Sequence, residues 1–223
     1  EFLWDSRVVE LPRLLWWLIL HGVILRVRPA RSVRKYQAIW TPDGSPLLVI
    51  SQRQKAAVAA QLTARCPGPV HVALGMRYGN PSIAAALAEL RAAGVERLLV
   101  LPLYPQYSAA TVASTFDAVA AELRTWRWLP ELRFITYYHD DPGYLDALAA
   151  QIRAERAEQP GERLLFSFHG LPQRNLLAGD PYYCQCQKTA RLVAERLELP
   201  TDAWAVAFQS RFGRAEWLQP YTS

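Results

Sequence analysis

The chain has 223 residues, of which 51% are hydrophobic, so it can form one large or two modest domains with a substantial core and is not a disordered protein. Its formal net charge of +5 suits an anionic partner. Nucleic acid is a poor candidate, because the sequence holds no zinc-finger spacing, no RNP-like aromatic segment and no long lysine-rich stripe. Its three cysteines are too few for a disulfide framework and indicate a reducing compartment.

Both ends of the chain have the character of internal segments. The first residues lack an initiator methionine and are typical of the middle of a helix-turn-helix passage, and the last residues are loop-like. We expect an internal fragment of a longer protein; processing, or a numbering that omits disordered ends, is the alternative.

The most apolar stretch is 11–25, which is shorter than the ~20 residues that cross a bilayer and contains Arg13 and His21. It predicts a helix that is buried or docked on a surface. Residues 26–35 then carry five cations and no acid. An apolar helix followed by a basic run can lie on an anionic membrane or line a pocket for an apolar molecule with carboxylate tails. A solvated basic face is the simpler alternative.

From residue 70 onward, apolar runs rich in β-formers alternate with segments of helical periodicity. Strands are expected at 70–78, 132–138, 163–170 and 203–210, and 97–107 is expected to be an apolar strand followed by a loop. Helices are expected at 81–94, 109–126, 142–156 and 186–199. This order predicts an α/β fold whose parallel strands are buried on both faces. A change of composition at 137–143 marks a boundary between two similar α/β halves.

Ligands of an open parallel sheet bind beyond the carboxyl ends of its strands. The polar and aromatic residues expected there are Met76, Arg77, Tyr78, Tyr104, Tyr107, Ser108, His139, Asp140, Asp141, His169, Gln209, Ser210 and Arg211. Phosphate-binding glycine motifs, the G-x-S-x-G elbow and the HExxH zinc motif are all absent from the sequence.

Two possible metal sites have simpler explanations. His139, Asp140 and Asp141 could bind a metal, but the run HDDPG is also an ordinary helix entry with an aspartate N-cap. Cys184 and Cys186 lack a second Cys/His cluster, so we expect structural or surface thiols there rather than a zinc site.

His169 follows the apolar run LLFSF and is followed by Gly170 and Pro172, which end the strand and fix a turn. A neutral imidazole is a good ligand for ferrous iron and a good proton acceptor. Spacing alone leaves two interpretations open: a functional His169 and an ordinary strand-end histidine.

The segment FSFHGLPQRNLLAGDPYYCQCQKTARLVAERL, which contains His169, closely resembles the signature of ferrochelatases. These enzymes insert ferrous iron into protoporphyrin IX in the last step of haem synthesis. Four more segments are similar to ferrochelatase segments in the same order: RKYQAIWTPDGSPL, LGMRYGNPSI, LPLYPQYSAATVAST and FQSRFGRAEWLQPYT. The resemblance covers essentially the whole chain, and its details look bacterial.

The resemblance implies two Rossmann-like chelatase domains, each a parallel β-sheet flanked by helices, with the porphyrin cleft between them. We expect the N-terminal domain at 1–139, without its first strand and with an apolar lip segment at 11–36. A truncated C-terminal domain is expected at 140–223.

The resemblance also assigns site residues. His169 matches the active-site histidine, which is catalytic and meets the metal. Porphyrin contacts are implied for Arg28, Tyr36, Ser45, Arg77 and Tyr104. Gln37 and Ala38 stand where relatives often carry paired arginines. The family's catalytic glutamate would lie beyond Ser223, so the fragment itself is expected to be inactive.

Protoporphyrin IX and Fe²⁺ are the implied substrates, with no tightly bound cofactor and no iron–sulfur cluster within this chain. We expect a cytoplasmic protein with peripheral membrane contact through 11–36, at the inner membrane face, and no nucleic-acid partner. The alternatives are a coproporphyrin or cobalt chelatase, and a non-catalytic tetrapyrrole-binding or membrane-docking module.

Overall fold

The structure, a computed structural model, describes residues 1–27, 33, 36–211, 213 and 215–222. The chain divides into two compact units, Glu1–Leu99 with Ser114–Arg133 and Val100–Ala113 with Phe134–Ser223. Each unit is described by itself. The domains expected at 1–139 and 140–223 stay a prediction.

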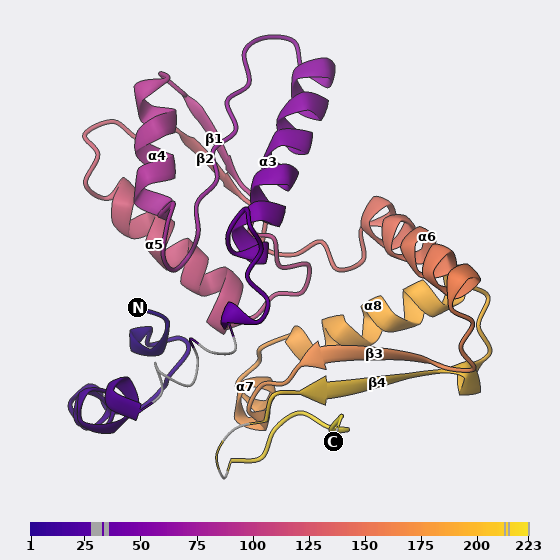
Figure 1. The fold of residues 1–223 in the computed structure, drawn as a ribbon. Helices are drawn as coiled ribbons and strands as arrows, with labels where there is room; N and C mark the ends of the chain where they lie inside the picture. Colours follow the sequence, from indigo (N-terminus) through magenta and orange to yellow (C-terminus); the bar gives the residue numbers. More distant parts are fainter. Residues whose placement is uncertain (28–32, 34–35, 212, 214, 223) are drawn as a thin grey trace. The chain divides into compact units, whose positions relative to one another are not determined.

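The first unit is mostly helical and holds most of a short parallel sheet (Figure 1). Its elements are η1 (Phe2–Trp4), α1 (Arg13–Ile19), η2 (Leu20–Ile24), α3 (Pro46–Arg65), α4 (Ile83–Ala92), β1 (Arg97–Val100), α5 (Ser114–Leu123) and β2 (Glu131–Phe134). The bonds from Glu131 N to Glu96 O (2.8 Å) and from Ile135 N to Val100 O (3.0 Å) advance in the same direction along both strands, so β1 and β2 are parallel.

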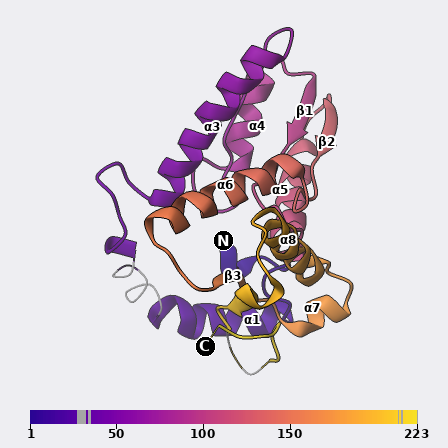
Figure 2. The ribbon, with the colours of Figure 1, turned by 90° about the vertical axis from the view of Figure 1, so that its right-hand side faces the viewer.

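The second unit is a parallel pair of strands covered by helices on one face (Figures 1 and 2). It contains η3 (Ala109–Ala113), α6 (Pro142–Glu158), β3 (Leu164–His169), α7 (Gln173–Leu177), α8 (Tyr182–Arg196), η4 (Thr201–Ala203) and β4 (Trp204–Gln209). The register pairs Leu164 with Trp204 and His169 with Gln209, so both strands end at the same edge.

Helix α8 forms the core of the second unit because its small and apolar side chains recur at helical spacing. Cys186, Ala190 and Val193 are completely buried, and the first two pack in one cluster with Phe208 of β4. Helix α8 also packs against α6. The α/β fold with parallel sheets flanked by helices is thereby confirmed, but the prediction of burial on both faces is wrong for β3, whose residues alternate between half-buried and exposed.

Several expected elements differ from those observed. Residues 71–75, within the strand expected at 70–78, form no strand. Met76, in the same expected strand, makes an isolated bridge to Ser82. An extended segment becomes a strand only when a neighbour bonds its backbone, and the described residues form no such ladder with 71–75. Strand β1 stops at Val100, and the loop expected in the rest of 97–107 contains Pro102 and Pro105, which have no N–H to donate.

The apolar stretch 11–25 is helical, as expected, in α1 and η2. Its burial is limited: Trp16 and Leu20 are buried, whereas Leu14, Trp17 and Leu18 are exposed. The helix is therefore only partly buried, and docking of its exposed side chains on a surface stays a prediction. Among the described residues, no helix has the length and apolar character needed to span a membrane.

Candidate functional site

His169 is the last residue of β3 and lies on its exposed face. The strand alternates, so that Phe166 and Phe168 pack toward the core while Ser167 and His169 point to the other side. The sequence correctly places an imidazole at the carboxyl end of a parallel strand, which is where this class of sheet binds its ligands.

The hydrogen bonding of His169 fixes its tautomer. Its Nδ1 lies 2.7 Å from the carbonyl oxygen of Gly170. Because a carbonyl oxygen only accepts, Nδ1 must carry the proton, and the lone pair of the neutral ring is on Nε2. The exposed ring therefore offers an unprotonated nitrogen, which is what a proton acceptor or a metal ligand requires.

Gly170 is required by a close approach of two backbone segments. Its N–H donates to Gln209 O at 2.7 Å, and a Cβ on residue 170 would lie 2.9 Å from that oxygen and 3.3 Å from the Trp217 ring. No side chain fits there without a backbone shift, so the turn that holds His169 depends on this glycine.

Replacing Gly170 with alanine is expected to lower the free energy of unfolding by about 1–3 kcal/mol, because the new methyl group overpacks against backbone. Urea unfolding would measure the loss. Gly161→Ala is the matched control, since a Cβ there meets nothing within 4 Å, and its effect should stay within about 0.5 kcal/mol. Equal effects of both substitutions would contradict the close-approach argument.

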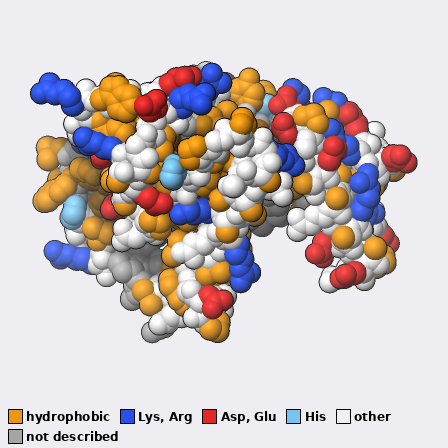
Figure 3. Space-filling view, turned by 90° about the horizontal axis from the view of Figure 1, so that it is seen from above, with side chains coloured by type: hydrophobic (Ala, Val, Ile, Leu, Met, Phe, Trp, Pro, Cys, Tyr) orange, Lys and Arg blue, Asp and Glu red, His pale blue; other side chains and the backbone are white. Residues whose placement is uncertain are grey.

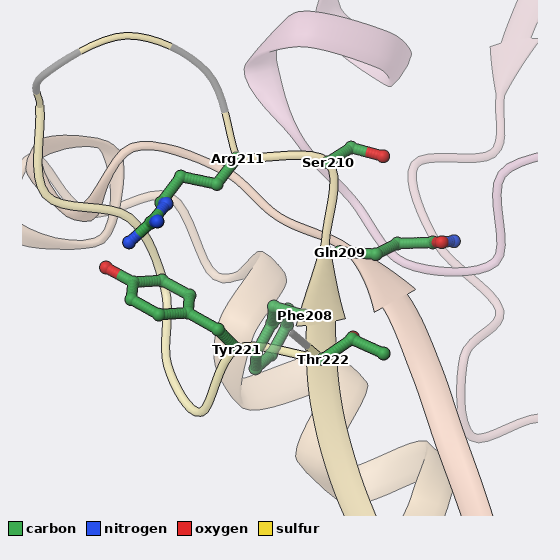
Figure 4. A pocket seen from close by; sticks show the side chains of 6 residues that line it. All are labelled: Phe208, Gln209, Ser210, Arg211, Tyr221 and Thr222. Carbon is green, nitrogen blue, oxygen red and sulfur yellow. The ribbon is translucent and has the colours of Figure 1, made fainter.

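A cavity of about 440 Å³ opens where β4 ends (Figure 4). Its lining residues are Phe208, Gln209, Ser210, Arg211, Tyr221 and Thr222. The Arg211 guanidinium lies over the Tyr221 ring, 4.6 Å from its centre, and Ser210 has a left-handed φ of 71°. The strand-end prediction named Gln209, Ser210 and Arg211, whereas Tyr221 and Thr222 come from a later segment that no local pattern connects to the cavity.

Arg77 of the first unit is held by a buried carboxylate. Its Nη2 lies 2.5 Å from Asp5 Oδ2, and its Nε donates to the Ser114 oxygens Oγ (2.7 Å) and O (2.9 Å). Tyr78 and Ser114 also donate to Asp5 Oδ2, at 2.8 and 2.5 Å, and the Arg7 N–H donates to its Oδ1 at 2.8 Å. The Asp5 side chain is only 6% exposed, so this cluster fastens the start of the chain to the strand-end residues Arg77 and Tyr78.

Opposing effects set the pKa of Asp5. Burial acts to raise it, but the hydrogen bonds from Ser114, the Arg7 backbone and Tyr78, together with the charge of Arg77, outweigh burial and lower it. Sequence patterns missed Asp5 altogether, because it belongs to no motif and its partners lie far along the chain.

Comparison with known proteins identifies the family. A family model described as ferrochelatase matches residues 1–223. The chain belongs to the ferrochelatase family. It is 61% identical to the ferrochelatase of Thioalkalivibrio sulfidiphilus over 223 residues and 63% identical to that of Nitrosococcus oceani over 222, covering 100% and 99% of this chain. It spans about 60% of the length of both relatives. Ferrochelatase 2 of Shewanella oneidensis is 56% identical, with 68% of its length covered.

The ferrochelatase resemblance expected from the sequence is thus confirmed, while the individual porphyrin contacts stay predictions. Tyr36, Ser45 and Arg77 belong to the first unit, and Tyr104 and His169 to the second. Tyr36 is exposed and Ser45 precedes α3, whereas Tyr104 lies in the loop after β1. Arg28 lies outside the described residues.

The capping interpretation of HDDPG is confirmed. The Asp141 side chain accepts from Tyr144 N at 3.0 Å at the start of α6, and Asp140 pairs with Lys188 at 2.5 Å. Within the described ranges, no group of three His, Cys, Asp or Glu residues could hold a metal ion. The metal-site alternative for His139, Asp140 and Asp141 is therefore wrong.

The cysteines are as expected. Cys184 is exposed, whereas Cys186 is buried in the core beside Phe208. Burial raises the pKa of Cys186 to about 12, which leaves it an unreactive thiol at neutral pH.

The buried His139 should make the free energy of unfolding depend on pH. It is 5% exposed, its Nδ1 has no hydrogen-bond partner, and Asp140 Oδ1 lies 3.8 Å away. Burial lowers the pKa of His139; Asp140 acts to raise it, and Lys188 to lower it further. The unfolded chain therefore binds a proton more readily than the folded one. The free energy of unfolding should fall as the pH drops below about 6.5, the ordinary pKa of histidine.

Urea unfolding of wild type and His139→Gln between about pH 8 and pH 5 tests this effect. The variant should lose the part of the slope that His139 contributes. Identical slopes in the two proteins would show that His139 titrates alike in the folded and unfolded states.

Proposed function

We propose that the longer protein to which this chain belongs is a ferrochelatase enzyme, a lyase that inserts Fe²⁺ into protoporphyrin IX to form protohaem in the last step of haem biosynthesis. The observation that carries the proposal is the exposed imidazole of His169, which ends β3 within the ferrochelatase segment. Membership of the family over residues 1–223 supports it.

The chemistry explains why an imidazole is needed. Iron insertion replaces two pyrrole N–H protons by one Fe²⁺, which must also lose its water ligands. Nε2 of His169 accepts a pyrrole proton or coordinates the arriving metal, and both roles require its lone pair. Two pyrrole protons must leave, so a second catalytic group is needed beside His169. The resemblance assigns this role to a glutamate that would lie beyond residue 223.

Porphyrin binding is assigned to the five residues that the ferrochelatase resemblance implies. A porphyrin is a flat apolar disc with two carboxylates, so it needs aromatic or aliphatic walls and cations at its edge. The proposed contacts are Arg28, Tyr36, Ser45, Arg77 and Tyr104. Iron enters as a substrate, and we expect no resident cofactor and no iron–sulfur cluster in this chain.

Peripheral membrane contact through 11–36 is part of the proposal, and would place a cytoplasmic enzyme at the inner membrane face. Leu14, Leu15, Trp17 and Leu18 are each about half exposed or more, and hydrophobic side chains gather at the left-hand edge of the space-filling view (Figure 3). Such a face suits the headgroup boundary of a lipid surface. In the basic run 26–35, the structure describes Arg26, which is exposed. The other four cations of the run lie outside the described residues.

A substrate panel with the full-length protein tests the function. Fe²⁺ with protoporphyrin IX should give protohaem faster than Co²⁺ or coproporphyrin gives its product, and absorbance spectra follow each reaction. Faster reaction with Co²⁺ or coproporphyrin would favour a related chelatase. Quenching of porphyrin fluorescence without metallation by any metal would favour a binding module.

A further inference from the structure

The loop that carries Tyr104 is tied to the start of α8 by a carboxylate. Asp180 lies between α7 and α8, and its Oδ2 accepts hydrogen bonds from Ser108 Oγ (3.1 Å) and from Ala109 N (2.8 Å). Its other oxygen, Oδ1, accepts from Tyr182 N at 3.0 Å. A single side chain thus satisfies backbone N–H groups of two segments that are distant in sequence.

Further bonds fix the same loop along α8. Tyr107 N donates to Gln185 Oε1 at 2.6 Å, and Gln106 Nε2 donates to Thr189 Oγ1 at 3.0 Å. Gln106, Ser108, Gln185 and Thr189 are all buried, so water does not readily replace these bonds. The loop therefore has one position relative to α8.

The other end of the connection reaches His169. The ring of Tyr182 packs on the cluster that contains Cys186 and Phe208, and Phe168, the neighbour of His169 in β3, packs on the same cluster. Burial raises the pKa of Tyr182, so the hydroxyl keeps its proton at neutral pH. Hydrogen bonds therefore connect the loop through Asp180 to Tyr182, and packing on the shared cluster connects Tyr182 to the strand that ends in His169.

We propose that Asp180 is a positioning residue that holds the Tyr104 loop in place relative to His169. It touches neither substrate nor metal and acts through Ser108, Ala109 and Tyr182. Its relevance to catalysis rests on the proposed function, because only then do Tyr104 and His169 meet the same porphyrin. A fixed spacing between them determines how tightly the porphyrin binds.

The test uses the full-length protein with Asp180→Ala and Asp180→Asn. Alanine removes all three bonds, whereas asparagine keeps one acceptor oxygen. The matched control is Asp146→Asn, because Asp146 is an exposed carboxylate of the same unit that pairs only with Arg196 among the described residues. Hydrogen exchange followed by mass spectrometry and the porphyrin KM and kcat are measured for each variant.

We expect exchange of 104–113 to accelerate by about tenfold in Asp180→Ala and by less in Asp180→Asn, with no change in the Asp146 control. The porphyrin KM should rise by about tenfold while kcat changes less, since loss of stability alone would lower the active fraction without moving KM. If Asp180→Ala fails to fold, Asp180→Asn decides by the same readouts.

Exchange at the wild-type rate in both variants would overturn the inference, as would faster exchange with an unchanged KM. Absence of metallation by the wild-type protein would instead overturn the proposed function. In that case the exchange rates of 104–113 would still decide whether Asp180 holds the loop.

Discussion

His169→Ala in the full-length protein is expected to slow protohaem formation by about 10³-fold. Removal of a positioned proton acceptor typically costs 10²- to 10⁴-fold, and loss of a metal contact would add to that cost. The substitution should leave the fold intact, because His169 is exposed and, among the described residues, its ring bonds only the carbonyl oxygen of the adjacent Gly170. Initial rates at saturating porphyrin and Fe²⁺ measure the effect.

The control for this prediction is His71→Ala, which removes an exposed histidine of the first unit. It should retain the wild-type rate. A His169→Ala protein that forms protohaem at the wild-type rate would show that this imidazole neither accepts the proton nor holds the metal.

Asp5→Ala is expected to lower the free energy of unfolding by about 3 kcal/mol, because it leaves Arg77 without its carboxylate partner in a mostly buried site. The hydroxyls of Tyr78 and Ser114 lose the same acceptor. Since hydrogen bonding and Arg77 lower the pKa of Asp5, its contribution is present at neutral pH and is lost as the pH falls through the folded-state pKa.

Asp117→Ala provides the comparison for Asp5→Ala. Asp117 also pairs with an arginine, Arg7, at 2.5 Å, but its side chain is 46% exposed. Its loss should cost less than about 1 kcal/mol, since solvent screens such a pair. Urea unfolding followed by tryptophan fluorescence measures both variants, and equal costs would contradict the buried role of Asp5.

The elements that the sequence predicts well are those with local start and stop signals. Ser82 caps α4 by accepting from Ala85 N, and Asp141 caps α6, both near the expected start of their helices. Helix α3 was not predicted, because most of its side chains are exposed and leave no apolar stripe to detect. Local sequence patterns indicate helix caps and periodicity. They do not show whether a segment such as 70–78 finds a neighbouring strand to bond its backbone.

In the candidate site, too, the features that depend on local sequence are predictable and those that depend on distant contacts are not. The run LLFSFHG predicts that an imidazole ends β3, and the structure agrees. The proton on Nδ1 could not be predicted, because it depends on where the Gly170 carbonyl points. The contacts of Asp5 with Arg77 and of Asp180 with Ser108 join residues about 70 positions apart, so only the folded chain brings them together.

In its neutral form, the ring of His169 at the end of β3 keeps its lone pair on Nε2, because Nδ1 donates to the Gly170 carbonyl oxygen. The most direct measurement is a long-range ¹H–¹⁵N spectrum of histidine-labelled full-length protein at about pH 8, where an ordinary imidazole is neutral. Loss of signals in His169→Gln assigns the ring. We predict the tautomer protonated on Nδ1; a ring protonated on Nε2 would contradict the account.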